Sequence, residues 1–356
     1  MRFDVPIPPG AAERAHRVAM AAFAERRPTP KRRSYWRPAI VIAVVAALAG
    51  ILASPPGRSV IRSIREAVGV ENAKQELFSL PAPGRLLVES PRGPWIVTAD
   101  GSRRLLGDYR EASWSPFGRF VAGARSNELV ALDPEGGVRW TIARPGVRAP
   151  RWGGLHDDTR VAYLARDGLH VVAGDGTGDR LLAPGKQGPF AWRPGALAEL
   201  LVAAPGGLRL EDTDSGRVLW HVATAPAQRI AWSADGGRVF VVTPRGLRVY
   251  DPTGRLVIRD AGPVRDATFV GAGHRIAVLR PDGAVVLLGA TKPIFRAAGL
   301  RRVVSAPDGR RLLLTWPAAD QWVFVRVAAP HTLDAVSGIA RQFGGGRFPD
   351  VSGWVK

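Results

Sequence analysis

The stretch EASWSPFGR at residues 111–119 comes back six times along this chain in altered form. If Trp114 is taken as the anchor of this stretch, the matching anchors are Trp152, Trp192, Trp232, Phe269, Ser305 and Trp354. Successive anchors are 38, 40, 40, 37, 36 and 49 residues apart. When strands fill the intervals, a period of about 40 residues is typical of four-stranded units that are arranged in a ring.

The intervals between anchors read as short strands separated by turns. After Trp232, the runs 238–242 (RVFVV), 247–250 (LRVY) and 255–258 (RLVI) are rich in Val, Leu and Tyr and are bounded by Gly, Pro and Asp. Runs of this kind predict strands joined by tight turns. The other intervals follow the same pattern, so the region 83–356 is predicted to be an all-β domain.

The two ends of this region complement each other. Residues 84–107 contain three predicted strands but no anchor strand, whereas residues 349–355 form an anchor strand with no unit after it. We therefore expect a seven-bladed β-propeller in which the C-terminal strand supplies the missing innermost strand of the first blade. Closure removes free sheet edges. Residues 331–346 fill the long last interval and are expected to form a short helix and a glycine linker that cross to the first blade.

Three motifs carry a family resemblance: WSPFG at 114–118, WSADG at 232–236 and APDGRRLLL at 306–314. They resemble the WD40-like repeats of bacterial membrane-anchored TolB-type β-propellers over residues 83–355. The resemblance implies a propeller outside the cytoplasm that more often serves as a binding platform than as an enzyme. Phe269 and Ser305 depart from the repeat pattern. The anchors Trp114, Trp152, Trp192, Trp232, Phe269 and Trp354 are interpreted as structural, because a tryptophan packed between blades buries about 200 Å².

A predicted membrane helix precedes the propeller. Residues 38–57 carry no charge, and 20 residues of helix span about 30 Å, the thickness of the bilayer hydrocarbon. Basic residues concentrate before this segment, which places the N-terminus in the cytoplasm and the propeller on the extracytoplasmic side of the cell membrane. A cleaved signal peptide and a buried core helix are the alternative interpretations of the same segment.

The segments on either side of the predicted span are each open to two interpretations. Residues 1–37 form a basic cytoplasmic tail in which residues 11–27 are expected to be helical, either as a solvated juxtamembrane helix or as a docking helix for a cytoplasmic partner. Residues 58–82 comprise a predicted amphipathic helix at 58–78 and a linker. That helix either lies on anionic lipid headgroups or packs against the propeller as a stalk.

The composition argues against several classes of function. The formal net charge is +19, but only five of the 50 basic residues are lysine, a skew to arginine that GC-rich coding sequences produce. No nucleic-acid partner is therefore inferred from the charge alone. The chain has no cysteine, and its six histidines do not have metal-ligand spacing. No cofactor, metal site or catalytic residue is predicted.

Arginines recur just before the anchors. Arg110, Arg148, Arg265 and Arg301 stand four residues before an anchor, and Arg229 and Arg302 stand three residues before one. In a ring of blades these positions lie where the innermost strands begin, so the guanidinium groups would surround one mouth of the ring. Planar guanidinium groups bind carboxylate or phosphate. The alternatives are salt bridges between blades and codon bias.

Together these features predict a single-pass membrane protein whose extracytoplasmic propeller binds a protein, a peptide or an anionic envelope polymer without catalysis. The second interpretation is a transmembrane regulator of the anti-sigma-like kind, in which residues 11–27 hold a cytoplasmic partner. The third is a propeller hydrolase or lyase whose active site is assembled from distant loops.

Overall fold

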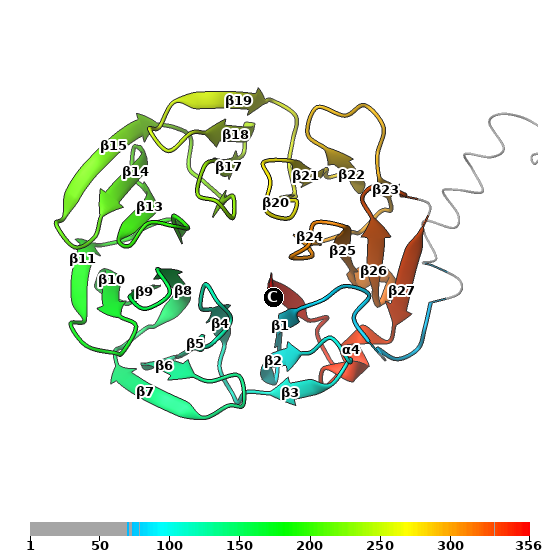
Figure 1. Cartoon of the computed structure of the whole chain (residues 1–356), viewed down its shortest axis with the longest axis horizontal. Coiled ribbons are helices and arrows are strands. Elements are labelled where there is room, and N and C mark those ends of the chain that lie inside the picture. The colour runs from blue at the N-terminus through cyan, green and yellow to red at the C-terminus, as the bar shows by residue number, and fades with distance from the viewer. Residues whose placement is uncertain (1–69, 71–72, 78, 331) are drawn as a thin grey trace, which may run out of the picture. The chain divides into compact units, whose positions relative to one another are not determined.

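The computed structural model describes residues 70, 73–77, 79–330 and 332–356, and these residues form a ring of seven antiparallel four-stranded sheets (Figure 1). The all-β prediction and the number of blades are confirmed. Blade 1 contains β28 (Asp350–Val355), β1 (Arg85–Ser90), β2 (Gly93–Val97) and β3 (Arg103–Leu105). Blade 2 contains β4 (Glu111–Trp114), β5 (Val121–Arg125), β6 (Glu128–Leu132) and β7 (Val138–Ala143). Blade 3 contains β8 (Arg148–Gly154), β9 (Thr159–Leu164), β10 (Gly168–Ala173) and β11 (Arg180–Pro184).

The remaining blades repeat this order from the axis outward. Blade 4 contains β12 (Phe190–Trp192), β13 (Glu199–Ala204), β14 (Gly207–Asp212) and β15 (Arg217–Ala223). Blade 5 contains β16 (Arg229–Trp232), β17 (Val239–Thr243), β18 (Gly246–Tyr250) and β19 (Leu256–Asp260). Blade 6 contains β20 (Asp266–Phe269), β21 (Ile276–Leu279), β22 (Ala284–Leu287) and β23 (Phe295–Arg296). Blade 7 contains β24 (Arg302–Ser305), β25 (Arg311–Trp316), β26 (Gln321–Arg326) and β27 (Leu333–Ser337), with η1 (Pro317–Ala319) between β25 and β26.

The C-terminal strand closes the ring as the sequence predicts. β28 pairs antiparallel with β1, and Trp354 lies opposite Leu86 in the register. The innermost strand of blade 1 therefore comes from the opposite end of the chain to the other three strands of that blade. We call the junction between blades 7 and 1 the seam.

Hydrophobic clusters fill the junctions between neighbouring blades. Among the described residues there are seven clusters, one for each junction. The aromatic anchors are 7–8% exposed, and each lies in the cluster between its own blade and the preceding one. Hydrogen bonds fix some of them, since the indole N–H of Trp192 donates to the Arg151 carbonyl at 2.9 Å and that of Trp354 donates to the Pro83 carbonyl at 3.2 Å.

The anchor position of blade 7 holds a small polar residue, and the packing there differs. The hydroxyl of Ser305 accepts a hydrogen bond from the N–H of Gly271, at 3.0 Å, across the junction. The turns at Gly271 and Gly309 lie so close that a Cβ on Gly271 would be 2.8 Å from the Gly309 Cα. Glycine is required at this approach because no side chain fits. Trp316, which is 1% exposed, supplies the large aromatic side chain of this junction from the end of β25.

The prediction for residues 331–346 was wrong in part. Residues 333–337 form β27, the fourth strand of blade 7, and only α4 (Ile339–Gln342) is helical. Pairing with β26 gives these residues strand hydrogen bonds, for example at Val323 opposite Ala335, which a helix would forgo. The glycines at 344–346 all have positive φ values and follow α4, consistent with a turn into β28.

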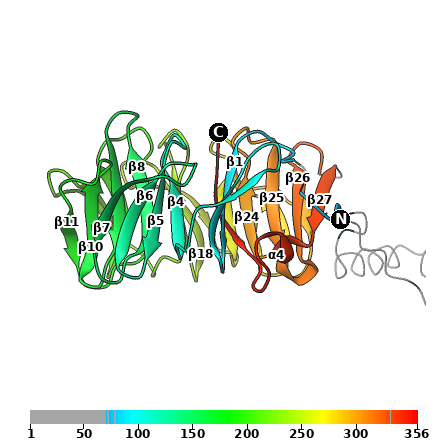
Figure 2. The ribbon, with the colours of Figure 1, turned by 90° about the horizontal axis from the view of Figure 1, so that it is seen from below.

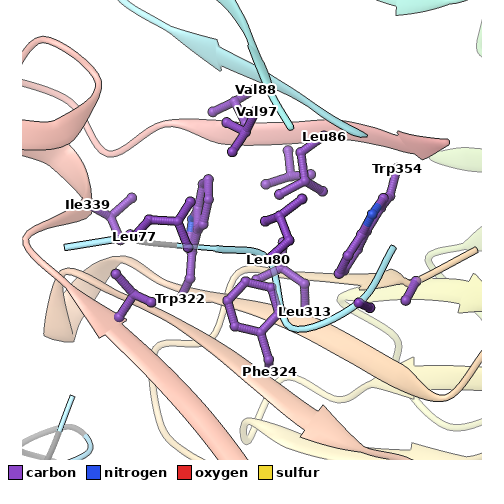
Figure 3. Packing of buried hydrophobic residues seen from close by; sticks show 14 of the residues in the cluster. Leu77, Leu80, Leu86, Val88, Val97, Leu313, Trp322, Phe324, Ile339 and Trp354 are labelled. Atoms are coloured by element: carbon purple, nitrogen blue, oxygen red, sulfur yellow. The ribbon is translucent and has the colours of Figure 1, made fainter. Parts of the chain in front are cut away.

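The prediction of a helix over 58–78 was also wrong for the described residues at its C-terminal end. Lys74 pairs in parallel with Val336 of β27, and Leu77 is buried in the seam cluster. Figure 3 shows Leu77 and Leu80 among the side chains of Trp322, Phe324 and Trp354. Residues 73–77 therefore lie along blade 7 without helical structure, and Leu77 and Leu80 fix this path by their burial in the seam cluster. We call residues 73–82, apart from 78, the strap.

The other N-terminal predictions lie outside the described residues. These are the cytoplasmic tail at 1–37 with its helix at 11–27, the membrane span at 38–57 and the part of the amphipathic helix before residue 70. In the part of the chain that is described, neither α4 nor η1 is long and apolar enough to cross a membrane.

Candidate ligand-binding face

All seven innermost strands begin on the same side of the ring. Each blade has four antiparallel strands, so the chain returns to the same side before it starts the next innermost strand. We call this side the strand-start face. In Figure 2 it is the lower side, where α4 lies, whereas the C-terminus ends on the upper side. The six predicted arginines precede or begin innermost strands and therefore belong to the strand-start face.

Three of these arginines are exposed. Arg110, Arg148 and Arg265 lie directly before or at the start of β4, β8 and β20. Within the described residues, no carboxylate lies within 4.0 Å of their guanidinium nitrogens. Arg265 donates to the Leu300 carbonyl at 2.9 Å, which fixes its position without neutralising its charge. These three side chains remain available to an anion from solution.

The other three arginines form ion pairs between blades. Arg229 of blade 5 pairs with Asp266 of blade 6. Arg301 and Arg302 precede and begin β24 of blade 7, and both pair with Asp350 of β28, at 3.0 and 3.3 Å. These carboxylates neutralise the guanidinium groups in part. Of the six predicted arginines, three are therefore paired with carboxylates and three are not. The role of the six as an anion-binding ring stays a prediction.

Carboxylates on this face also hydrogen-bond to the backbone of the next blade. Glu111 of β4 accepts from the N–H of Ala149 at 2.5 Å, and Asp266 of β20 accepts from the N–H of Val303 at 2.9 Å. Charge-assisted hydrogen bonds of this kind are stronger than neutral ones. The carboxylates therefore hold neighbouring innermost strands in register and are not free to bind a cation.

Arg151 is an additional charged residue on this face that the sequence interpretation missed. The pKa of Arg151 is lowered by burial, against the attraction of Glu89 and Glu111, although solvent still reaches the side chain. Its guanidinium donates to the Pro150 carbonyl at 2.8 Å, and no described carboxylate lies within salt-bridge distance. Arg151 is exposed in the structure, and a guanidinium without a directly paired carboxylate is a favourable partner for an incoming anion.

A bulge in β8 sets the position of Arg151. The register with β9 shifts between Arg148 and Arg151, and Ala149 has a φ of 51°, an uncommon value for a residue other than glycine. Bulges of this kind redirect side chains next to functional sites. The sequence held one clue, because the residue before the other tryptophan anchors is small in every case: Ser113, Ala191, Ala231 and Gly353.

Burial also shifts the pKa values of Glu89 and Arg229, which lie near Arg151. The pKa of Glu89 is raised, mainly by burial, while the hydrogen bond from the N–H of Ala112 and the charge of Arg151 oppose the rise. The pKa of Arg229 is lowered by burial against the attraction of Asp266. Arg229 nevertheless keeps 31% of its side chain exposed, so solvent reaches the charged groups near the innermost strands.

A polar pocket of about 430 Å³ adjoins Arg110 on the strand-start face. Arg125 pairs there with Asp108 at 2.5 Å, and its guanidinium stacks over the Tyr109 ring with 4.6 Å to the ring centroid. The pocket is lined by Asp108, Arg110, Arg125, Ser126, Asn127 and Glu128. Since the acids engage Arg125, Arg110 is the pocket's unpaired charge.

Among the described residues, no group of three or more His, Cys, Asp or Glu side chains is arranged to hold a metal ion. His170 lies in β10 and is 2% exposed, and His221 lies in β15. Asp212 ends β14, and its carboxylate accepts from the N–H groups of Asp214 and Ser215. These contacts are typical of the tight turn that joins β14 to β15.

No protein-family model matches this chain, and no curated protein matches its sequence. Solved structures match its fold. The C-terminal WD40 domain of Sif2 is 13% identical with a TM-score of 0.55, and the match covers 76% of this chain and 90% of that one. The β-propeller domain of Cps50 (Swd1) from Myceliophteria thermophila is 12% identical with a TM-score of 0.52, and the match covers 69% of this chain and 91% of that one.

The chain has a WD40-like seven-bladed β-propeller fold. A third match, the WD40 domain of Neurospora crassa Pan2, is 13% identical with a TM-score of 0.50 and covers 64% of this chain and 78% of that domain. Identities this low establish the shared architecture alone. The ligand of this WD40-like propeller has to be inferred from its own side chains.

Proposed function

We propose that this WD40-like propeller is a non-enzymatic binding protein whose strand-start face holds an anionic group of a protein, a peptide or an envelope polymer. The observation that carries the proposal is the set of arginines without a paired carboxylate on one face. Arg110, Arg148 and Arg265 are exposed there, and Arg151 lies nearer the axis. Guanidinium groups present paired N–H donors that match carboxylate and phosphate oxygens.

The proposal includes a location outside the cytoplasm. The uncharged segment at 38–57 would anchor the chain in the cell membrane, and the basic residues before it would keep the N-terminus inside. The motifs at 114–118, 232–236 and 306–314 support a relation to TolB-type propellers. A propeller displayed in this way would meet proteins and polymers of the envelope.

The arrangement favours binding over chemistry. The carboxylates of Glu89, Glu111, Asp266 and Asp350 on this face are engaged by backbone N–H groups or by arginines. A general base has to be free to accept a proton from a bound substrate. These carboxylates instead form contacts between neighbouring blades, so they are not free to act as general bases.

Retention on an immobilised anionic polymer tests the proposal. The full chain is purified in detergent and loaded on a poly-glutamate column, and the salt concentration that elutes it is measured. Replacement of Arg110, Arg148 and Arg265 by glutamine should lower the affinity about tenfold, since exposed ion pairs contribute about 0.2–1 kcal/mol each. Arg151→Gln, added to this triple variant, should lower it further.

A matched variant separates the face from the overall charge. Arg217, Arg275 and Arg310 are exposed arginines in turns or strand starts on the other side of the ring. Their replacement by glutamine removes the same charge and should leave elution nearly unchanged. Equal losses in the two triple variants would mean that net charge alone governs retention, and the proposed face would then be rejected.

A further inference from the structure

The outermost strand of blade 5 differs from the other blade edges. β3 and β23 have three and two residues, and β27 is covered in part by the strap at Lys74. β19 has five residues, and three in succession are aliphatic and exposed: Leu256 at 45%, Val257 at 42% and Ile258 at 40%. Three adjacent exposed aliphatic residues on a sheet edge require an explanation, because such an edge readily pairs with another chain.

One side of β19 is open to strand addition. β19 pairs with β18 on its inner side, with a bulge at Val257 where the register shifts, and no described strand pairs with its outer side. In an antiparallel pair, alternate residues direct their N–H and C=O groups away from the neighbouring strand. β19 therefore offers both unpaired backbone groups and aliphatic side chains to an extended segment.

The chain already shows extended backbone added to the edge of another blade. The N–H of Lys74 donates to the Ala335 carbonyl at 2.8 Å, and the N–H of Ser337 donates to the Lys74 carbonyl at 2.7 Å. These two bonds attach the strap to β27. Outer edges in this ring are thus sterically accessible to an extra extended segment.

The charges at β19 indicate whether a second copy of this chain or a different partner pairs with this edge. Arg255 and Arg259 are exposed on either side of the three aliphatic residues. In a symmetric antiparallel pair of two such edges, the arginines at the ends of the aliphatic run in one copy would lie beside those of the other copy. Like charges that are directly opposite destabilise a pair of strands, whereas opposite charges stabilise it. Arg255 contacts Asp251 at 3.0 Å but keeps 79% of its side chain exposed.

We propose that β19 is a docking site for an extended segment of a partner protein that carries aliphatic residues between two acidic residues four positions apart. The partner adds to the blade as a fifth strand. Its acidic residues lie opposite Arg255 and Arg259, and its aliphatic residues cover those of β19. This site is on the rim of the ring and is independent of the strand-start face.

Two labelled peptides test the site on the full chain in detergent. TEVIVET places glutamates opposite both arginines, and TKVIVKT replaces the glutamates with lysines. Fluorescence anisotropy should show about tenfold tighter binding of the glutamate peptide, as expected for two cross-strand charge pairs of changed sign. The double variant Arg255→Glu, Arg259→Glu should reverse the order of the two peptides. A photo-crosslinker on the peptide should label β19.

A matched control distinguishes this edge from general electrostatics. Arg139 of β7 pairs with Asp133 at 3.2 Å, so it is a paired arginine on the outermost strand of another blade. Arg139→Glu should leave both peptides unaffected. Equal binding of the two peptides, an unchanged order in the double variant or crosslinks to another blade would overturn the proposal. So would a dimer of the unmodified chain that Val257→Lys dissociates, because the second copy would then occupy the edge.

Discussion

The strap is predicted to keep the seam closed, and two leucines carry most of this effect. Leu77 and Leu80 are 5% and 7% exposed, and both pack in the seam cluster with Trp322 and Trp354. The strap also bonds to both sides of the seam, because the N–H of Leu80 donates to the Ala99 carbonyl of blade 1 at 2.9 Å. The double variant Leu77→Ala, Leu80→Ala removes the apolar contacts and leaves the backbone unchanged.

The expected cost follows from the burial of the two side chains. Replacement of a buried leucine by alanine destabilises a protein by about 2–5 kcal/mol. The two sites share one cluster, so their effects are not additive, and about 4 kcal/mol is a conservative sum. If the loss opens the seam locally, amide exchange in β28 should accelerate about a thousandfold, because each 1.4 kcal/mol corresponds to about a factor of ten.

Hydrogen exchange resolved by mass spectrometry measures this effect. β28 should lose protection, whereas β17 in blade 5, which is remote from the seam, should lose much less. Val218→Ala with Leu256→Ala is the control, since these side chains are 46% and 45% exposed and their loss should change stability by about 0.5 kcal/mol or less each. Unchanged exchange in β28 of the Leu77, Leu80 variant would refute the reasoning.

Two further predictions concern hydrogen bonds. In urea titrations, Trp192→Phe should lower the free energy of unfolding by about 1 kcal/mol more than Trp152→Phe does. The reason is that the indole N–H of Trp192 donates to the Arg151 carbonyl, whereas the buried indole N–H of Trp152 has no partner among the described residues. Equal losses in the two variants would contradict this. Asp251 has a pKa lowered to about 2 by hydrogen bonds from Thr253, so its stabilising effect is complete above about pH 4 and is lost as the pH falls through about 2. Asp251→Asn should therefore flatten the pH dependence of the urea midpoint in that window, and an unchanged slope would exclude this cause.

The sequence predicted the ring because its signals are local. Turn residues and alternating apolar residues mark each strand, and the regular anchors mark each blade. The incomplete first unit and the unpaired last strand at 349–355 then required closure, which the pairing of β28 with β1 confirms. Local signals failed at 333–337, where pairing with β26 decides the conformation, and at 73–77, where burial of Leu77 in the seam outweighs the helical spacing.

The candidate site was predicted only as a set of arginines on one face. Some of these arginines form ion pairs and others do not, and the outcome depends on which carboxylates come close when the blades assemble. Asp350 is 48 residues from Arg302 in the sequence, yet it reaches both Arg301 and Arg302 at the seam. The role of Arg151 depends on the bulge at Ala149, which no spacing in the sequence reveals.

The number of blades, their order and the closing strand could be predicted from the sequence, because strand alternation and turn chemistry act over a few residues and repeat with each blade. The pairing of the arginines, the course of the strap and the exposure of three adjacent aliphatic residues on β19 follow only from the folded ring. These features depend on contacts between segments that are far apart in the chain, and their distances are fixed only when the ring closes.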